Sequence, residues 1–195
     1  MPSLSEAVGV AFGFAYVVLV IRQNVWCWPT GLANALLFTV VFFHARLYGA
    51  MGLQVVYMAL MLYGWREWTH GAETGGALAV ARTARRWRIG LALAGAVGGV
   101  ALGLFLRYRT DAALPFWDGG TTAFSLVAQF MTTRKWIENW YVWLAVDTVY
   151  VGMYASQGLY PTAALYVAFL VLAILGLIEW RRSLHSQVPG VDESA

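Results

Sequence analysis

The sequence repeats itself after 112 residues, and this repeat constrains the fold more than any other feature. Residues 22–68 align without a gap with residues 134–180, and twelve of the 47 aligned positions are identical. In an apolar chain, a repeat of this length is typical of transporters built from two related halves around a central site. The identical pairs include Arg22 with Arg134, Trp28 with Trp140, Gly64 with Gly176, Glu67 with Glu179, and Trp68 with Trp180.

The composition indicates a membrane protein. Hydrophobic residues make up 60% of the chain and charged residues 12%, whereas soluble domains carry about 25% charged residues. A soluble domain of 195 residues could not bury this much apolar surface, so most of it must face lipid or other spans. Cys27 is the only cysteine, and neither a disulfide framework nor a cysteine metal site is expected.

The predicted fold is all-α, with seven transmembrane helices. Each apolar run approaches the ~20 helical residues needed to cross a hydrocarbon core of about 30 Å. The first run lacks a basic leader and a cleavage site, so we interpret it as a retained span. The predicted spans are Leu4–Ile21, Val25–Phe43, Gly49–Trp65, Ile89–Leu106, Phe116–Thr133, Ile137–Ala155 and Tyr160–Trp180.

The basic residues predict the orientation. With seven spans, ten of the 13 Lys and Arg residues lie on one side, and only Arg46, Arg107 and Arg109 lie on the other. The positive-inside rule then places the N-terminus outside and the C-terminus in the cytoplasm. The ten residues on the cytoplasmic side are Arg22, Arg66, Arg82, Arg85, Arg86, Arg88, Arg134, Lys135, Arg181 and Arg182.

The span count also predicts how the two halves are related. Three spans invert the chain and one linking span restores its direction, so we expect a parallel 3+1+3 repeat with its axis along the membrane normal. The expected units are a first three-helix repeat (1–68), a cytoplasmic linker with a linking helix at 89–106 (69–110), a second repeat (111–182) and a disordered cytoplasmic tail (183–195).

The connecting segments have architectural roles in this prediction. The linking helix reads Gly95-x-x-x-Gly99-x-x-x-Gly103, a small-residue face on which another helix can pack. The preceding segment contains three glycines and then four arginines, and we expect a flexible linker ending in a lipid-headgroup anchor rather than a nucleic-acid site.

The fifth span carries a polar stripe. Asp118, Thr122, Ser125, Gln129 and Thr132 are spaced by three or four residues and therefore share one helix face. For Ser125 and the threonines we favour a helix–helix hydrogen-bonding seam, and Asp118 could cap the helix. Gln129 lies deep in the span and is the better candidate for binding a substrate.

The sixth span carries an aromatic stripe with a carboxylate at its centre. Trp136, Trp140, Trp143, Asp147, Tyr150 and Tyr154 share one face, and Asn139 precedes Trp140. Rings around a buried anion suit a flat aromatic cation, since each good stacking or cation–π contact contributes roughly 1–2 kcal/mol. The alternative for Asp147 is a structural hydrogen bond to a neighbouring span. In the first half, Asn34 and Gln54 either bind the substrate or bridge helices.

The sequence contains no signature of an enzyme or a pump. H-E-x-x-H, Gly-x-Ser-x-Gly and the P-loop Gly-Lys-Ser/Thr are all missing. The three histidines are too scattered for a metal site. We therefore expect neither catalysis nor a cofactor.

Several segments resemble the PnuC family of bacterial vitamin-precursor transporters. These are Phe42-Phe43-His44-Ala45-Arg46-Leu47-Tyr48, Leu53-Gln54-Val55, Tyr63-Gly64-Trp65, Pro115-Phe116-Trp117-Asp118 and Arg134-Lys135-x-x-Glu138-Asn139-Trp140-x-x-Trp143. The resemblance implies a fold related to the SWEET sugar transporters, a homotrimer, and uptake of nicotinamide riboside across the bacterial inner membrane by facilitated diffusion with trapping by phosphorylation. It also implies that Asn34, Gln54, Asn139, Trp140 and Trp143 line the substrate site.

One residue departs from the family pattern. Position 147 is Asp here, whereas members associated with nicotinamide riboside can carry Asn. A carboxylate suits the pyridinium of nicotinamide riboside or the thiazolium of thiamine and counts against neutral riboflavin. We expect nicotinamide riboside, with thiamine as the alternative. Outside transport, the chain could be a membrane receptor or scaffold that binds the solute without moving it.

Overall fold

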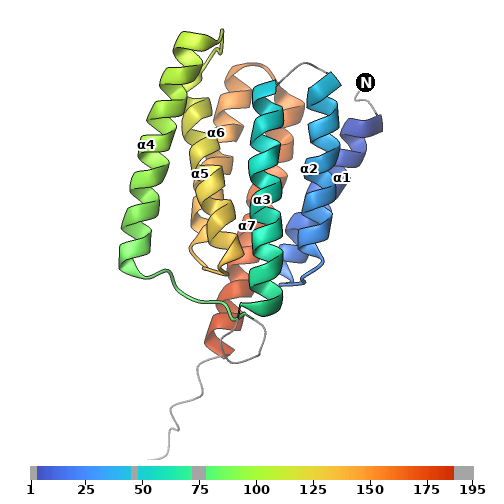
Figure 1. Ribbon diagram of the computed structural model, residues 1–195, viewed down its shortest axis with the longest axis vertical. Coiled ribbons are helices and arrows are strands. Elements are labelled where there is room, and N and C mark those ends of the chain that lie inside the picture. The colour runs from blue at the N-terminus through green and yellow to red at the C-terminus, as the bar shows by residue number, and fades with distance from the viewer. Residues whose placement is uncertain (1–3, 45–47, 72–77, 187–195) are drawn as a thin grey trace, which may run out of the picture.

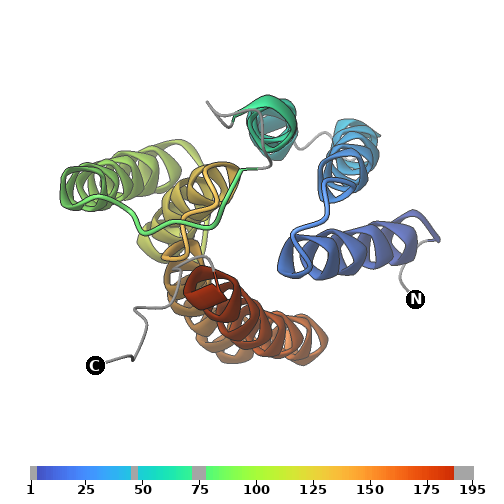
Figure 2. The ribbon, with the colours of Figure 1, turned by 90° about the horizontal axis from the view of Figure 1, so that it is seen from below.

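The computed structural model describes residues 4–44, 48–71 and 78–186, and these residues form seven α-helices (Figure 1). Six of the helices run side by side, and α4 lies outside them against α5 (Figure 2). The helices are α1 (Leu4–Ile21), α2 (Cys27–His44), α3 (Tyr48–His70), α4 (Arg85–Arg109), α5 (Pro115–Thr133), α6 (Asn139–Ser156) and α7 (Tyr160–Ser186).

Each helix contains most of a predicted span, and the differences lie at the ends. α3 and α4 extend beyond the predicted runs because their terminal turns carry polar and charged residues, which the search for apolar runs omitted. α7 continues to Ser186, so the first four residues of the predicted disordered tail are helical and the rest lie outside the described residues. Among the described helices, α2, α4 and α7 are long and apolar enough to cross a membrane, and Val8–Ile21 is a shorter apolar helix.

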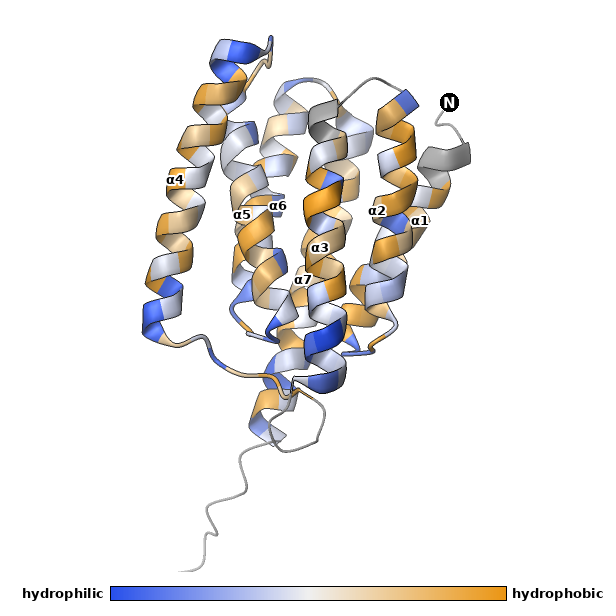
Figure 3. Ribbon diagram, in the orientation of Figure 1, coloured by the Kyte–Doolittle hydropathy of each residue, from blue (hydrophilic) through white to orange (hydrophobic). Residues whose placement is uncertain are grey.

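The distribution of side chains is the reverse of that in a soluble protein. Large apolar side chains are exposed along the outer helices, including Val97 at 68% and Leu93 at 61% on α4, and Figure 3 shows the apolar residues that run along this helix. Polar side chains are buried instead, among them Ser125, Gln129 and Asp147. An apolar exterior around a polar interior is the arrangement that a hydrocarbon solvent favours.

The glycine-rich face of α4 packs against α5. Gly95, Gly99 and Gly103 are buried, and a Cβ built on Gly99 would lie 3.0 Å from the Cα of Gly120. A Cβ on Gly119 would lie 2.5 Å from the backbone nitrogen of Gly103. The expected small-residue packing face is therefore confirmed, because the two backbones approach too closely for any side chain.

Related positions of the two halves make the same contacts within each half. Trp28 and Trp68 meet edge to face with ring centroids 5.1 Å apart, and their counterparts Trp140 and Trp180 do so at 5.4 Å. A methyl group at Gly64 would overlap the ring of Trp28, as one at Gly176 would overlap the ring of Trp140. Three of the identities in the repeat are thus explained by one packing unit that occurs twice.

Two hydrogen bonds between the halves also join corresponding positions of the repeat. The indole of Trp68 donates a hydrogen bond to the carbonyl oxygen of Thr132 (3.2 Å), and that of Trp180 donates to the carbonyl oxygen of Val20 (3.1 Å). Because position 20 corresponds to 132 and position 68 to 180, each half gives the other the same bond. At the helix level, α3 packs on α5 and α7 packs on α1.

The turn between the first two helices of each half has the same backbone geometry. Gln23 and Lys135 occupy corresponding positions, and both have a left-handed backbone, with φ of 53° and 49°. Non-glycine residues adopt this region uncommonly, so its occurrence at both positions indicates that the tight turn is part of the repeated unit.

Residues 78–84 of the predicted flexible linker are held by contacts with the second half, whereas Gly75 and Gly76 of the same linker lie outside the described residues. Residues 78–84 cross beneath α5 (Figure 2), and Ala81 forms a parallel bridge with Trp136 beside the α5–α6 turn. Val80 and Thr83 are buried, with exposed fractions of 2% and 1%. Hydrogen bonds to the turn, which a composition-based prediction cannot anticipate, hold this segment in place.

Candidate functional site

A cavity of about 400 Å³ lies between the two halves, within the 300–1,000 Å³ range of small-molecule sites. All six helices of the two halves contribute to its wall, and α4 contributes no residue. The lining residues with polar or aromatic side chains are Tyr16, Asn34, Phe38, Phe42, Gln54, Tyr57, Ser125, Gln129, Thr132, Trp140, Trp143, Asp147, Tyr150, Tyr166 and Phe169.

Corresponding positions of the repeat line opposite walls of the cavity, but their side chains differ. Gly31, Ala35 and Phe38 of α2 correspond to Trp143, Asp147 and Tyr150 of α6, and all six line the cavity. Position 54 is Gln in the first half, and its counterpart is Tyr166. The repeat therefore places the wall positions symmetrically, while the sequence differences place the carboxylate and the indole of Trp143 on the second half alone.

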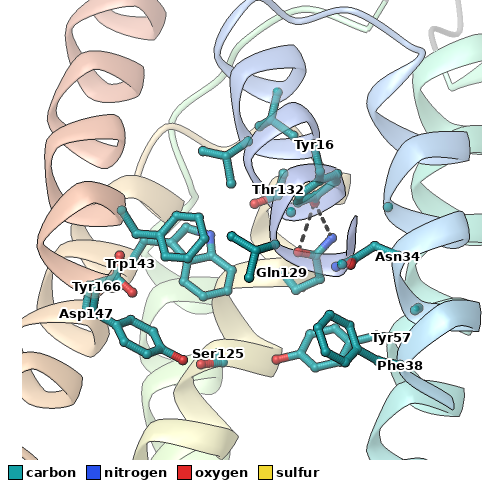
Figure 4. A pocket seen from close by; sticks show the side chains of 18 of the residues that line it. Tyr16, Asn34, Phe38, Tyr57, Ser125, Gln129, Thr132, Trp143, Asp147 and Tyr166 are labelled. Carbon is teal, nitrogen blue, oxygen red and sulfur yellow. Dashed lines mark hydrogen bonds between the residues drawn. The ribbon is translucent and has the colours of Figure 1, made fainter. Parts of the chain in front are cut away.

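Gln129 and Tyr16 form a polar contact across the boundary between the halves (Figure 4). The Tyr16 hydroxyl lies 3.0 Å from Oε1 and 2.8 Å from Nε2 of Gln129. The same Nε2 lies 3.8 Å from the sulfur of Met61. Since Gln129 is only 2% exposed, these contacts hold its amide in one place at the cavity wall.

Asp147 lies in the wall formed by α6 and is 5% exposed. Among the described residues, no cation forms an ion pair with its carboxylate, and no donor lies within hydrogen-bonding distance. Figure 4 shows this side chain with Trp143 and Tyr166 around the cavity. A buried carboxylate that faces a cavity and has no protein partner is suited to attract a cationic ligand.

Aromatic rings stack beside the carboxylate. Tyr150 and Tyr166 have ring centroids 4.5 Å apart, and Tyr154 lies 5.8 Å from the first and 5.4 Å from the second. Phe169 contacts Tyr166 at 6.0 Å and stacks on Phe14 of α1 at 4.9 Å. Because stacked rings restrain one another, this group forms a rigid apolar wall.

Two polar atoms of cavity residues are buried without a partner among the described residues. They are Oδ1 of Asn34, an acceptor, and Nε1 of Trp140, a donor. Leaving a buried polar group unsatisfied costs about 1–3 kcal/mol. The indole nitrogen of Trp28, the counterpart of Trp140, is also buried without a partner among the described residues, so the unpaired indole belongs to the packing unit that occurs in both halves.

Seven of the eight predicted site residues lie on the wall of this cavity: Asn34, Gln54, Gln129, Trp140, Trp143, Asp147 and Tyr150. Asn139 does not line the cavity. It is fully buried at the start of α6, and its Nδ2 donates to the carbonyl oxygen of Trp136 at 2.7 Å. Its side chain instead stabilises the turn that precedes Trp140.

The sequence analysis missed several cavity residues, chiefly Tyr16, Tyr57, Tyr166 and Phe169. The sequence contained a signal for three of them. Tyr57 lies one helical turn after the predicted Gln54, and Tyr166 and Phe169 are the counterparts of Gln54 and Tyr57 in the second half. Tyr16 belongs to the first span, which precedes the aligned part of the repeat, and its role depends on tertiary contact with Gln129.

A buried apolar cluster closes one end of the cavity. It contains Val20, Cys27, Trp28, Met61, Trp68, Val80, Ile137, Trp140, Ala173 and Trp180. Next to it, the ammonium nitrogen of Lys135 lies 4.4 Å from the ring centroid of Trp68. Burial lowers the pKa of Lys135, because the low-dielectric surroundings disfavour its charged form.

An ion pair joins the halves at the same end. Arg134 contacts Glu67 at 2.7 Å and donates to the hydroxyl of Tyr63 at 2.9 Å. This ion pair and the hydrogen bonds of Trp68 and Trp180 all lie at the end of the bundle that carries the α1–α2 and α5–α6 turns.

Comparison with known proteins identifies the family. The family model described as "Nicotinamide mononucleotide transporter" matches residues 3–182. The nicotinamide riboside transporter PnuC of Escherichia coli is 27% identical over 93% of this chain and 87% of its own length. The riboflavin/roseoflavin transporter RibM of Streptomyces davaonensis is 32% identical over 90% of this chain and 84% of its own length.

A solved structure has the same fold. It is a crystal structure of the vitamin B3 transporter PnuC, with a TM-score of 0.72 and 26% sequence identity, covering 93% of this chain and 82% of that one. The family model extends over nearly the whole chain, and the predicted resemblance is therefore confirmed. The chain belongs to the PnuC family of nicotinamide mononucleotide transporters and is a multi-pass membrane protein.

Proposed function

We propose that this protein takes up nicotinamide riboside by facilitated diffusion. The observation that carries the proposal is the unpaired carboxylate of Asp147 beside stacked rings in a cavity between the halves. Nicotinamide riboside combines a flat cationic ring with a carboxamide and ribose hydroxyls. It would therefore place positive charge near the carboxylate and polar groups near the amides of the opposite wall.

The roles of the cavity residues follow from their chemistry. Trp140, Trp143 and Tyr150 supply ring faces for the pyridinium, and Asp147 supplies the opposite charge. The side-chain amides of Asn34, Gln54 and Gln129 offer donors and acceptors for the carboxamide and ribose. Asn139 acts indirectly in this proposal by fixing the turn that orients Trp140.

We further propose that the halves form a parallel 3+1+3 repeat, with α4 as the linking helix and the axis along the membrane normal. The exchanged bonds of Trp68 and Trp180 support this, since a two-fold axis relates such a pair of contacts. By the positive-inside rule, the end with the α5–α6 turn faces the cytoplasm, and the N-terminus lies outside the inner membrane.

Facilitated diffusion requires no energy source in the protein itself. The sequence has no P-loop for ATP hydrolysis, and a cytosolic kinase would make uptake effectively one-way because the added phosphate group is negatively charged and would be repelled by the carboxylate of Asp147. The homotrimer that the resemblance implies is part of the same proposal.

Riboflavin is a second candidate because RibM is 32% identical to this chain. Charge favours nicotinamide riboside, because riboflavin is neutral and gains no Coulomb attraction from Asp147. Thiamine is also a cationic aromatic. The charge argument therefore does not distinguish it from nicotinamide riboside, and a binding measurement is needed to do so.

Calorimetry of the purified protein with the three solutes tests the proposal. We expect binding of nicotinamide riboside to be at least tenfold tighter than that of neutral riboflavin and also tighter than that of thiamine, and proteoliposomes to equilibrate the tightly bound solute down its gradient. Tighter binding of riboflavin or thiamine would overturn the substrate assignment. Binding without equilibration would replace transport with a receptor role.

A further inference from the structure

The segment that joins the first half to α4 is bound to the second half through its main chain. The amide of Ala81 donates to the carbonyl oxygen of Lys135, and the amide of Ile137 donates to the carbonyl oxygen of Ala81, both at 3.0 Å. These two bonds pair residues 78–84, which we call the strap, with the turn between α5 and α6. The strap crosses under α5 in Figure 2.

A side-chain contact fixes the far end of the strap. Both the amide and the hydroxyl of Thr83 donate to one carboxylate oxygen of Glu138, at 2.8 Å and 2.7 Å. Thr83 is 1% exposed. Hydrogen bonds to an ionised acceptor are stronger than neutral ones, so this contact anchors the strap at the residue that precedes α6.

The strap also contributes to the apolar cluster that closes the cavity. Val80 is 2% exposed and belongs to the same cluster as Trp68, Trp140 and Trp180, and Leu78 packs against it. A solute that leaves the cavity through this end must pass the indoles, and the strap lies beyond them.

A simple connection between α3 and α4 would require none of these contacts. The corresponding turn of the first half has no such strap in the described residues. There, Gln23 donates one side-chain hydrogen bond to Ser183 of α7 at 2.7 Å. The repeat therefore explains the shape of the two turns but not the segment that covers only the second one.

We propose that the strap latches the cytoplasmic gate: while residues 78–84 are bound to the α5–α6 turn, the inner end of the cavity stays closed, and they detach when the solute is released. Because the strap is attached to the first half through α3 and bound to the second, separation of the halves at this end would pull it off the turn. The inference rests on the proposed transport function and adds a moving part to it.

A reversible cross-link tests whether the strap must move. In a Cys27→Ala background, Ala81→Cys with Trp136→Cys joins the two residues of the bridge, since paired strands are ~4.8 Å apart and a disulfide spans that separation. Thr83→Cys with Glu138→Cys is a second pair that leaves Trp136 intact. We expect oxidation to reduce proteoliposome uptake at least tenfold, reduction to restore it, and affinity in calorimetry to change less than twofold.

Full uptake by both cross-linked forms would overturn the proposal, because a strap that never moves would then suffice. The single-cysteine variants under the same oxidant are the controls.

Accessibility of the strap gives a readout that does not depend on the identity of the solute. In the Cys27→Ala background, Val80→Cys is labelled from the cytoplasmic side with a membrane-impermeant maleimide. We expect Thr83→Val to raise the labelling rate at least fivefold. Thr110→Val is the matched control, because Thr110 bonds only to local positions at the other end of α4, and it should leave the rate unchanged.

Equal labelling with and without Thr83→Val would overturn the latch. If the protein fails to bind nicotinamide riboside, the substrate assignment is wrong, whereas the labelling comparison still decides whether the strap closes this end.

Discussion

Trp143 and Gly31 occupy the same position in the two halves, and both line the cavity. A larger residue in the first half would displace its neighbours, because a Cβ at position 31 would lie 2.8 Å from the sulfur of Met61 and 2.9 Å from the ring of Tyr16. The space left by Gly31 is therefore taken by Tyr16, which reaches Gln129. In the second half, the indole of Trp143 forms the wall itself.

Replacing Trp143 with Ala should weaken binding of nicotinamide riboside at least tenfold. One stacked indole contributes roughly 1–2 kcal/mol, and 1.4 kcal/mol corresponds to a factor of ten in affinity. Calorimetry measures the change, with Trp117→Ala as control, since Trp117 is 59% exposed and lies outside the cavity. An unchanged dissociation constant would remove Trp143 from the site.

Trp140→Ala should have a second effect that Trp143→Ala lacks. The ring of Trp140 packs on Gly176 and meets Trp180 edge to face at 5.4 Å. Its removal leaves a void in the closing cluster, and the loss of a large buried ring costs about 3–5 kcal/mol. We expect a clear fall in the melting temperature in detergent together with weaker binding. A variant that melts like the parent would contradict this packing role.

Tyr16→Phe tests the contact that orients Gln129. The substitution keeps the ring but leaves a buried amide without its hydroxyl partner, which costs about 1–3 kcal/mol. We expect lower thermal stability and a several-fold loss of affinity for the solute. Phe12→Leu, at a 38% exposed position of the same helix outside the cavity, is the control and should leave the affinity unchanged.

At the level of helices, the α4–α5 pair depends on backbone approach. The two neighbouring glycines of α5 differ sharply: a Cβ on Gly119 would lie 2.5 Å from a backbone nitrogen of α4, whereas a Cβ on Gly120 would have no atom within 4 Å. Adjacent positions of one helix thus provide a test with an internal control.

Gly119→Ala should lower the melting temperature by several degrees, because overpacking typically costs about 1–3 kcal/mol. Gly120→Ala should be neutral or slightly stabilising, since alanine favours the helix by roughly 1 kcal/mol. The measurement is the melting temperature of each variant, compared with that of the parent protein. Equal effects would mean that α4 does not pack as closely as the structure has it.

At the scale of the whole molecule, the repeat predicts that corresponding contacts of the two halves contribute similarly to stability. Trp68 and Trp180 donate the two exchanged hydrogen bonds. Trp68→Phe and Trp180→Phe should therefore lower the melting temperature by similar amounts, since each loses one buried bond worth about 0.5–1.5 kcal/mol and part of one ring. Trp65→Phe, at a 39% exposed position, is the control. If one of the two substitutions has no effect, the halves are not energetically equivalent.

Much of the fold was accessible from the sequence because its signals are local or repeated. Runs of apolar residues predicted the positions of the seven helices that the described residues form, and the spacing of Gly95, Gly99 and Gly103 predicted a packing face. Helical periodicity placed Gln129, Trp143 and Asp147 on faces that do line a cavity. These predictions succeeded because they depend on the geometry of one helix and on the solvent around it.

The sequence alone thus determined that this is a helical membrane protein of the PnuC type, with a repeated unit and an aromatic face beside a carboxylate. Only the tertiary structure decided that Tyr16 holds Gln129, that Asn139 supports a turn rather than the cavity wall, and that residues 78–84 are bound rather than loose. The reason is that each of these depends on contacts between segments far apart in the chain, which neither composition nor spacing encodes.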